Sequence, residues 1–125
     1  MTELALQKFA VTLLRFNAAP GVIAFAIPNG EARSARTGAK LKAMGVLAGV
    51  ADMAVIMPGG SARFLELKTP KGRLSDTQKA FRDRCAASGV AYETATTPEE
   101  VEAVLRGWGA LKMQRPIPVA TRKAA

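Results

Sequence analysis

The stretch DMAVIMPGGSARFLELK, residues 52–68, contains two apolar runs joined by a Pro-Gly-Gly turn. Residues 52–57 and 62–67 each have the length and composition of a β-strand, and the turn between them predicts an antiparallel hairpin. Asp52 begins the first strand and Glu66 lies late in the second. Pairing of the two strands would therefore bring these two carboxylates side by side.

The second strand carries two charged residues at the end of an otherwise apolar run. Alternate residues of a strand share a face, so Glu66 and Lys68 project together, while Leu65 and Leu67 face the other way. Two carboxylates and a lysine would then converge at one end of the sheet. Removing such groups from water costs several kcal/mol per ion unless partners compensate, so this arrangement needs a chemical reason.

Helical periodicity, capping residues and Pro or Gly breaks delimit the elements on both sides of the hairpin. The strand at 22–27 is apolar throughout and is expected to be largely buried, whereas the glycine-spaced link at 45–52 is expected to be an exposed loop. The order α-β-α-β-β-α-β-α predicts an α/β fold with one mixed β-sheet flanked by helices. Helices are predicted at residues 2–16, 34–44, 75–88 and 97–108, and the remaining strand at 90–95.

The composition excludes several kinds of chemistry. The chain has 125 residues, enough for one domain with its own core, and 49% of them are hydrophobic. It contains no histidine, which excludes histidine-based triads and histidine–zinc sites. Its one cysteine, Cys85, cannot form an internal disulfide and is predicted to be a small buried side chain. No apolar run approaches the roughly 18 residues that span a bilayer, and the N-terminus lacks a basic signal region, so we expect a cytoplasmic protein with no membrane partner.

The net charge of +8 favours a polyanionic partner, with nucleic acid first. Between residues 32 and 74 the only acidic residues are Asp52 and Glu66. Two close carboxylates repel, and an oxygen-only ligand set suits Mg²⁺ or Mn²⁺, so the pattern predicts metal-assisted hydrolysis of a phosphodiester. Eight basic residues lie in the same stretch: Arg33, Arg36, Lys40, Lys42, Arg63, Lys68, Lys71 and Arg73.

A purely structural interpretation of these residues stays open. Glu66 and Lys68 could be solvated residues on the open face of an edge strand, and Asp52 could be a turn or cap residue. The pattern is short and does not by itself separate the two interpretations.

The wider motif favours a catalytic interpretation. Asp52, then thirteen residues, then Glu66-Leu67-Lys68 has the form of the PD-(D/E)xK nuclease motif. From about residue 3 to residue 107 the chain resembles the small stand-alone VRR-NUC domain nucleases of phages and prophages. This resemblance implies a restriction-endonuclease-like α/β core. Its most specific elements besides the motif are Gly45-Val46, Gly49-Val50, Gly72-Arg73-Leu74-Ser75 and Gln78.

The resemblance implies a role for each matching residue. Asp52 and Glu66 would bind Mg²⁺ or Mn²⁺, with the backbone carbonyl of Leu67 as a third ligand. Lys68 would position or activate the attacking water, or stabilise charge on the phosphate. Gln78 would point into the site, but its position three residues after a serine also predicts a capping box. We expect that one side chain cannot easily do both.

Two positions depart from the family pattern. Ala51 stands where the family usually has proline before the aspartate, which removes local stiffness but no ligand. In the first helix the family carries a glutamate two residues before a glutamine, and here Ala5 stands two residues before Gln7. Glu3 lies four residues before Gln7 on the same helix face and is the candidate replacement ligand.

The resemblance also implies a function and a partner. The expected activity is that of a metal-dependent endodeoxyribonuclease, which acts as a homodimer on branched DNA such as Holliday junctions in a bacterial host cell. Tyr92 and Trp108 are expected in the core, which argues against a stacking platform for single strands. Two alternatives stay open: a basic DNA-binding protein with a degenerate acidic pair, and a restriction- or packaging-associated nuclease acting on duplex DNA. Contacts with DNA are expected at Asn29, Arg33, Arg36, Lys40, Lys42, Lys71 and Arg73.

The chain changes character after Gly109. Its last twelve residues, QRPIPVATRKAA, contain two prolines, three basic residues and no acidic one. We therefore expect residues 1–109 to form the nuclease domain and residues 110–125 to form a flexible basic tail.

Overall fold

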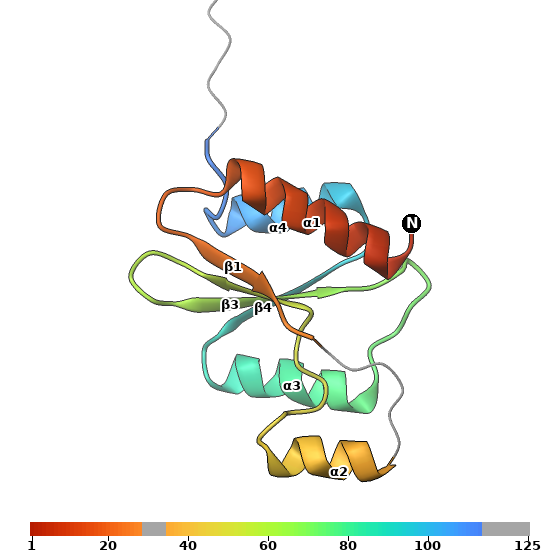
Figure 1. Cartoon of the computed structure of the whole chain (residues 1–125). Coiled ribbons are helices and arrows are strands. Elements are labelled where there is room, and N and C mark those ends of the chain that lie inside the picture. Colours follow the sequence, from red (N-terminus) through yellow and green to blue (C-terminus); the bar gives the residue numbers. More distant parts are fainter. Residues whose placement is uncertain (29–34, 114–125) are drawn as a thin grey trace, which may run out of the picture.

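The computed structural model describes residues 1–28 and 35–113, apart from the side chains of residues 35 and 36. Over these ranges helices and strands follow one another in the predicted order, and they form the predicted mixed sheet flanked by helices (Figure 1). None of these helices has the length and hydropathy needed to cross a bilayer. The helices are α1 (Glu3–Asn17), α2 (Ala35–Ala43), α3 (Asp76–Ala87) and α4 (Pro98–Gly107), and the strands are β1 (Ile23–Ala26), β2 (Met53–Ile56), β3 (Ala62–Leu67) and β4 (Ala91–Ala95).

The sheet has the strand order β1-β2-β3-β4. β1 and β3 each pair antiparallel with β2, and β4 pairs parallel with β3. The predicted hairpin is therefore present as β2 and β3. Its register pairs Met53 with Leu65, so Asp52, one residue before β2, lies opposite Glu66.

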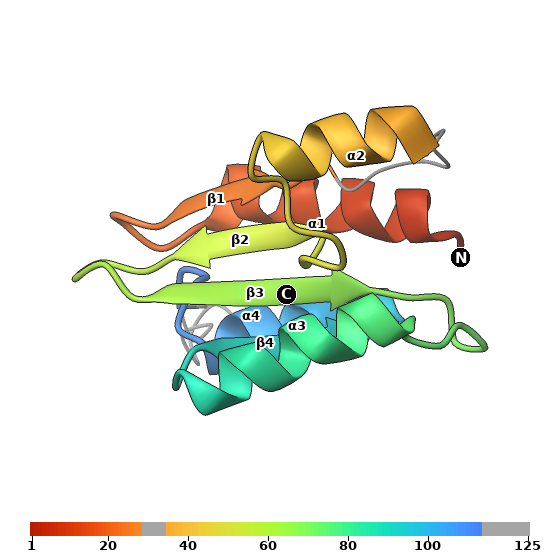
Figure 2. The same cartoon turned by 90° about the horizontal axis from the view of Figure 1, so that it is seen from below.

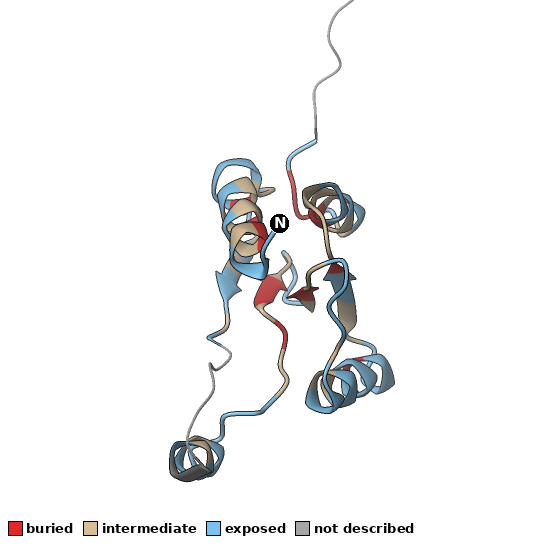
Figure 3. Cartoon of the chain, turned by 90° about the vertical axis from the view of Figure 1, so that its right-hand side faces the viewer, coloured by how far each residue is buried: buried red, intermediate tan, exposed pale blue. Residues whose placement is uncertain are grey.

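Helices cover the two faces of the sheet unequally. α1 and α4 lie side by side on one face, whereas α3 lies on the other face and α2 stands farther out on that same side (Figures 1 and 3). Figure 2 shows α3 across the β3–β4 half of the sheet, so the β1–β2 half of this face is not covered by α3. The two sides consequently differ in how much apolar surface they bury.

The main hydrophobic core lies between the sheet and the α1–α4 layer. Residues of β2 and β3 with odd numbers point into it, as the alternation predicted for Leu65 and Leu67 requires. Burying a side chain as large as leucine contributes about 1.5–3 kcal/mol, so this layer supplies much of the folding free energy. Neither α2 nor α3 contributes to this cluster, which consists of Leu6, Ala10, Leu14, Met53, Val55, Leu65, Leu67, Ala95, Val101, Leu105, Ala110 and Leu111.

A smaller aromatic cluster holds α3 against the opposite face. The ring of Phe81 packs edge to face on Phe64 of β3, with centroids 5.1 Å apart, and lies 6.0 Å from Tyr92 of β4. Cys85, one turn after Phe81, is buried as predicted. Edge-to-face rings at these distances attract one another beyond their area of contact, which orients α3 on the sheet.

The burial predicted for residues 22–27 is wrong. β1 is an edge strand, and its side chains are mostly exposed, with Ile23 62% and Phe25 49% accessible. Both project to the face that α3 leaves uncovered at this end of the sheet, because they pair with Ile56 and Ala54 of β2. Apolar composition predicted a strand correctly, but burial depends on the position of that strand in the sheet.

The predicted domain boundary after Gly109 is too early. Ala110 and Leu111 are buried in the core, and Leu111 forms a β-bridge with Ala18. The backbone N–H of Ala19 donates to the carbonyl of Ala110 at 2.8 Å, which ties this segment to the end of α1. The packed domain therefore extends at least through Leu111, and the rest of the predicted tail, residues 114–125, lies outside the described residues.

Candidate active site

Asp52 and Glu66 meet at the open end of the hairpin, away from its turn. The N–H of Leu67 donates to Asp52 Oδ2 at 2.8 Å, whereas the N–H of Lys68 donates to the carbonyl of Ala95 in β4 at 3.0 Å. Successive residues direct their backbone groups to opposite edges of a strand, so the backbone of Glu66 also faces β4. Asp52 and Glu66 thus form a non-hydrogen-bonded cross-strand pair, in which Cα atoms are about 4.5 Å apart and side chains approach most closely.

The carboxyl of Glu66 is buried, with 1% of the residue accessible. Burial is the largest cause that raises its pKa, and the charge of Asp52 and a hydrogen bond with its carboxyl raise the pKa further, to about 9. The positive charge of Lys68 lowers the pKa but does not outweigh these causes. Without a bound cation, the pair therefore holds one proton at neutral pH.

One carboxyl oxygen of Glu66 is buried without a hydrogen-bond partner in the described part of the chain. Oε1 accepts a hydrogen bond from Gln78 Nε2 at 3.4 Å, but Oε2 is buried and accepts none from the described residues. A buried acceptor without a donor costs about 1–3 kcal/mol. Glu66 and Asp52 can share a hydrogen bond only while one of the two carboxyls carries a proton, and that carboxyl is then the donor. A hard divalent cation would satisfy both carboxylates without that proton, so these residues fit a Mg²⁺ or Mn²⁺ site.

Gln78 both caps its helix and contacts the site, contrary to our expectation that it could not easily do both. Its Oε1 accepts from the N–H of Ser75 at 2.8 Å, while its own N–H donates to Ser75 Oγ at 3.3 Å, which completes the capping box of α3. The Nε2 end of the same amide donates to Glu66. The two ends of the amide thus connect the start of α3 to the buried carboxylate.

The link between α2 and β2 touches α3 at this point. Gly49 adopts a φ of +82°, and a Cβ built there would lie 2.3 Å from the backbone carbonyl of Thr77 and 2.7 Å from the nitrogen of Gln78. Only glycine permits so close an approach of two backbones. This contact holds the link, which leads directly to Asp52, against the residue that binds Glu66.

The remaining predicted ligand and catalytic residues are placed as follows. Lys68 is half-buried after β3 and close enough for its charge to lower the pKa of Glu66. Glu3 is exposed in the first turn of α1, and its charge is the smallest cause that raises that pKa. Within residues 1–28 and 35–113 no three acidic, cysteine or histidine side chains lie close enough together to hold a metal. The roles of Glu3 and of the Leu67 carbonyl as ligands stay predictions.

Four of the seven predicted DNA contacts lie in the described part of the chain with their side chains. Lys40 and Lys42 are exposed on α2, and Lys71 and Arg73 are exposed in the turn between β3 and α3. This turn follows Lys68 directly in the chain. The other three predictions, Asn29, Arg33 and the side chain of Arg36, lie outside the described residues.

Tyr92 lies close to the site, although the sequence predicted only a core residue. Its hydroxyl is buried without a hydrogen-bond partner among the described groups. Burial raises its pKa most, and the negative charges of Glu66 and Asp52 raise it too. Tyr92 pairs with Phe64, two residues before Glu66. Only the register of the parallel β3–β4 pair reveals this proximity, and no local motif in the sequence specifies that register.

Comparison with known proteins supports the resemblance to the VRR-NUC domain family. Residues 17–98 match the family model of the VRR-NUC domain. A solved structure described as a VRR_NUC domain protein superposes with a TM-score of 0.71 at 20% identity, covering 91% of this chain and 93% of its own. Another, described as a VRR_NUC domain, gives a TM-score of 0.60 at 18% identity, covering 86% of this chain and 99% of its own. No curated protein sequence matches the chain.

Proposed function

The chain belongs to the VRR-NUC domain family, a family of nuclease domains, and from this premise we propose that it is a Mg²⁺- or Mn²⁺-dependent endodeoxyribonuclease. One observation carries the proposal. The buried carboxyl of Glu66 is held against Asp52, and one of its oxygens has no donor that the described protein can supply without a bound proton. Such a pair is destabilising unless it binds a proton or a cation, so the site is better suited to catalysis than to structure.

Asp52 and Glu66 would hold the cation, with the carbonyl of Leu67 as the third protein ligand. The N–H of Leu67 points to Asp52, and the N–H and C=O of one strand residue point to the same edge. Its carbonyl therefore faces the carboxylate pair at a position where β2 has not yet begun. A bound Mg²⁺ or Mn²⁺ supplies Lewis acidity at the phosphoryl oxygens and lowers the pKa of water in the site.

Lys68 would act on the phosphodiester itself. It projects from the same face as Glu66, two residues along β3 and its extension. Its ammonium group would position the attacking water in line with the leaving oxygen and stabilise negative charge on the phosphate. Water then forms the new bond to phosphorus, the bond to the leaving sugar oxygen breaks, and a proton passes to that oxygen. Gln78 would hold Glu66 in the orientation that this geometry needs.

The substrate is proposed to be branched DNA such as a Holliday junction, cut by a homodimer. The exposed cations of α2 and of the turn after Lys68 support binding of a nucleic acid, because they offer positive charge to its phosphates. The preference for branched DNA rests on the likeness to stand-alone members of the family. A symmetric pair of sites would allow two strands of a junction to be cut within one complex.

Cleavage of a four-way junction, compared with a matched linear duplex at equal ionic strength, tests this function. We expect cutting that requires Mn²⁺ or Mg²⁺, that is lost in Asp52→Ala and Lys68→Ala, and that persists in Lys8→Ala. Lys8 is the matched control because it is exposed on α1, on the opposite face of the sheet. DNA binding that survives in all variants, with no cleavage by the wild type in Mn²⁺, would instead identify a binding protein with a degenerate site.

A further inference from the structure

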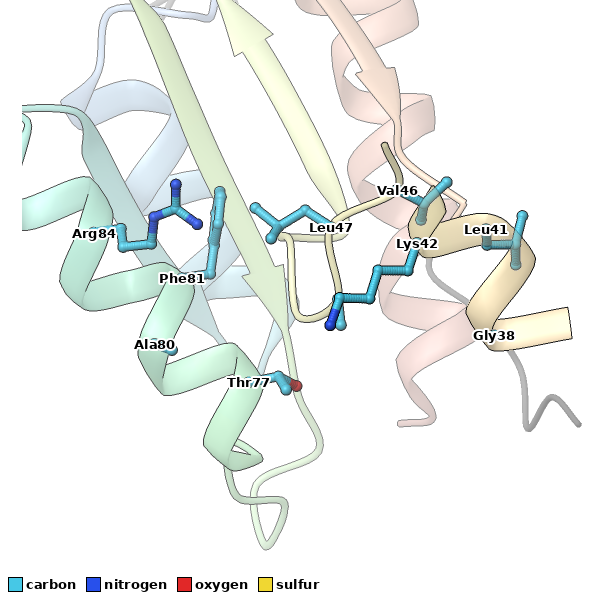
Figure 4. A pocket seen from close by; sticks show the side chains of 10 residues that line it. Gly38, Leu41, Lys42, Val46, Leu47, Thr77, Ala80, Phe81 and Arg84 are labelled. Carbon is cyan, nitrogen blue, oxygen red and sulfur yellow. The ribbon is translucent and has the colours of Figure 1, made fainter. Parts of the chain in front are cut away.

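A pocket of about 540 Å³ is shown in Figure 4. It lies on the same side of the sheet as the carboxylate pair, since α3 both lines it and carries Gln78, which contacts Glu66. The pocket is formed by α2, by the link between α2 and β2, and by residues 77–84 of α3. This volume is within the range of about 300–1,000 Å³ that is typical of small-molecule binding sites. The pocket belongs neither to the main core nor to the residues assigned above to catalysis.

The walls of the pocket are apolar and partly open to solvent. Val46 and Leu47 of the link are 42% and 43% accessible, and Phe81 of α3 forms the opposite wall. Figure 4 shows Leu47 pointing across the pocket toward Phe81. Large apolar side chains that line an open cavity indicate a surface that gains stability when a ligand covers it.

Two cations line the same pocket. Lys42 extends from α2 into the space beside the link, and the guanidinium of Arg84 lies on the α3 side, near Phe81 (Figure 4). Neither forms an ion pair with a carboxylate of the described residues. An apolar cavity with two unpaired positive charges is complementary to a molecule with an apolar planar part and negative charges, which is the chemistry of a nucleotide.

The pocket is connected to the candidate active site through a short path. Thr77 lines it, and the next residue, Gln78, donates to Glu66. The backbone of Gly49 packs on both residues. The link that forms one wall of the pocket therefore also contacts Gln78, the partner of Glu66. A nucleotide bound in this pocket would therefore be close, along the same DNA strand, to the phosphodiester held at the carboxylates.

We propose that this pocket binds one unstacked nucleotide of the DNA substrate, with its base between Leu47 and Phe81 and its phosphates near Lys42 and Arg84. The inference rests on the proposed nuclease function and gives it a physical basis for substrate choice. A base inside a continuous duplex must break its pairing and stacking to enter, at a cost of a few kcal/mol, whereas a base at a branch point, flap or bulge does not. DNA with an unpaired base beside the cut is thus the preferred class of substrate.

A double-mutant cycle between the pocket and the base tests the proposal. Ala80 is exposed on α3 and lines the pocket, so Ala80→Leu fills it without disturbing the core. Ala86→Leu is the matched control, since Ala86 is exposed on the same helix and does not line the pocket. Binding of the full chain is measured in EDTA, by fluorescence anisotropy, to duplexes with one unpaired nucleotide that carries either a base or an abasic sugar.

We expect the wild type and Ala86→Leu to bind the base-containing bulge about 10-fold more tightly than the abasic one, as loss of one stacked base predicts. Ala80→Leu should bind both equally and at the abasic level. Lys42→Ala and Arg84→Ala should each reduce the slope of the logarithm of the binding constant against the logarithm of salt concentration by about one. Lys8→Ala should not change the preference for base-containing over abasic DNA.

Two results would overturn the proposal. Equal losses by Ala80→Leu on the base-containing and abasic DNA would show that the pocket does not receive the base. The second result is a wild type that sediments as a dimer and an Ala80→Leu variant that sediments as a monomer at the same concentration. It would show that a second copy of the chain occupies the pocket. Failure of the nuclease function is a separate outcome, because base-dependent binding in EDTA requires no cleavage.

Discussion

Replacing Glu66 by glutamine should stabilise the protein in the absence of divalent cations. The variant keeps the shape of the side chain and an oxygen for Gln78, and it cannot ionise. In the wild type the pKa of Glu66 rises from 4.5 in the unfolded chain to about 9 in the folded one. Between these two values the folded protein holds a proton that the unfolded chain releases. The proton on Glu66 therefore stabilises the folded state. This contribution to the free energy of unfolding is fully present below pH 4.5 and is lost progressively as the pH rises to about 9.

The size of the effect follows from the same shift. Each pH unit above 4.5 costs the wild type about 1.4 kcal/mol, so about 3 kcal/mol of unfolding free energy is lost by pH 7. Glu66→Gln does not lose it. For a domain of this size the melting temperature at pH 7 should rise by about 10 °C. The difference between variant and wild type should shrink toward zero near pH 4.5.

Thermal and urea unfolding in EDTA at several pH values between 4.5 and 8.5 would measure this difference. Glu93→Gln is the matched control, since Glu93 is exposed on β4 and the same substitution there should leave the pH dependence of stability unchanged. Addition of Mg²⁺ should stabilise the wild type and not Glu66→Gln. A variant that is less stable than the wild type at pH 7, or one that keeps the wild-type pH slope, would refute the assignment of a proton-holding, cation-binding pair.

Three further substitutions separate the roles of neighbouring residues. Lys68→Ala should lower kcat by about 10²–10³-fold with little change in DNA affinity, which single-turnover cleavage and anisotropy would resolve. Gln78→Glu keeps an oxygen to cap α3 but places a negative charge beside Glu66. Cleavage should therefore fall, while the helix content measured by circular dichroism stays constant. An equal loss of cleavage and helix content would assign Gln78 to capping alone. Gly49→Ala should destabilise the protein by about 3 kcal/mol in urea unfolding, more than Gly45→Ala, because both have positive φ but only Gly49 contacts the backbone of α3.

Local patterns in the sequence were sufficient to predict the hairpin and the pairing of its carboxylates. The Pro-Gly-Gly turn defines where β2 and β3 reverse, and the two-residue period of a strand then places Glu66 and Lys68 on one face. Capping residues predicted the starts of α3 and α4 for the same reason, because a cap acts within three or four residues. These features depend on contacts that are short-range or that follow directly from one turn.

The features that the sequence did not predict depend on long-range packing. The exposure of Ile23 and Phe25 follows from the edge position of β1 and from the limited reach of α3. The proximity of Tyr92 to the carboxylates follows from a parallel register between strands that a helix separates in the chain. The double role of Gln78 was missed because we treated its side chain as a single group, although the two ends of an amide bond in different directions.

The separation of the core from the α2–α3 side has an evolutionary consequence. Folding depends mainly on the buried layer under α1 and α4, and this layer includes no residue of α2 or α3. Mutations in α2, in α3 and in the link between α2 and β2 can therefore alter what the molecule selects while most of its folding energy is retained. A lineage built on this domain could diversify its targets through small changes on one side and inherit the other side unchanged.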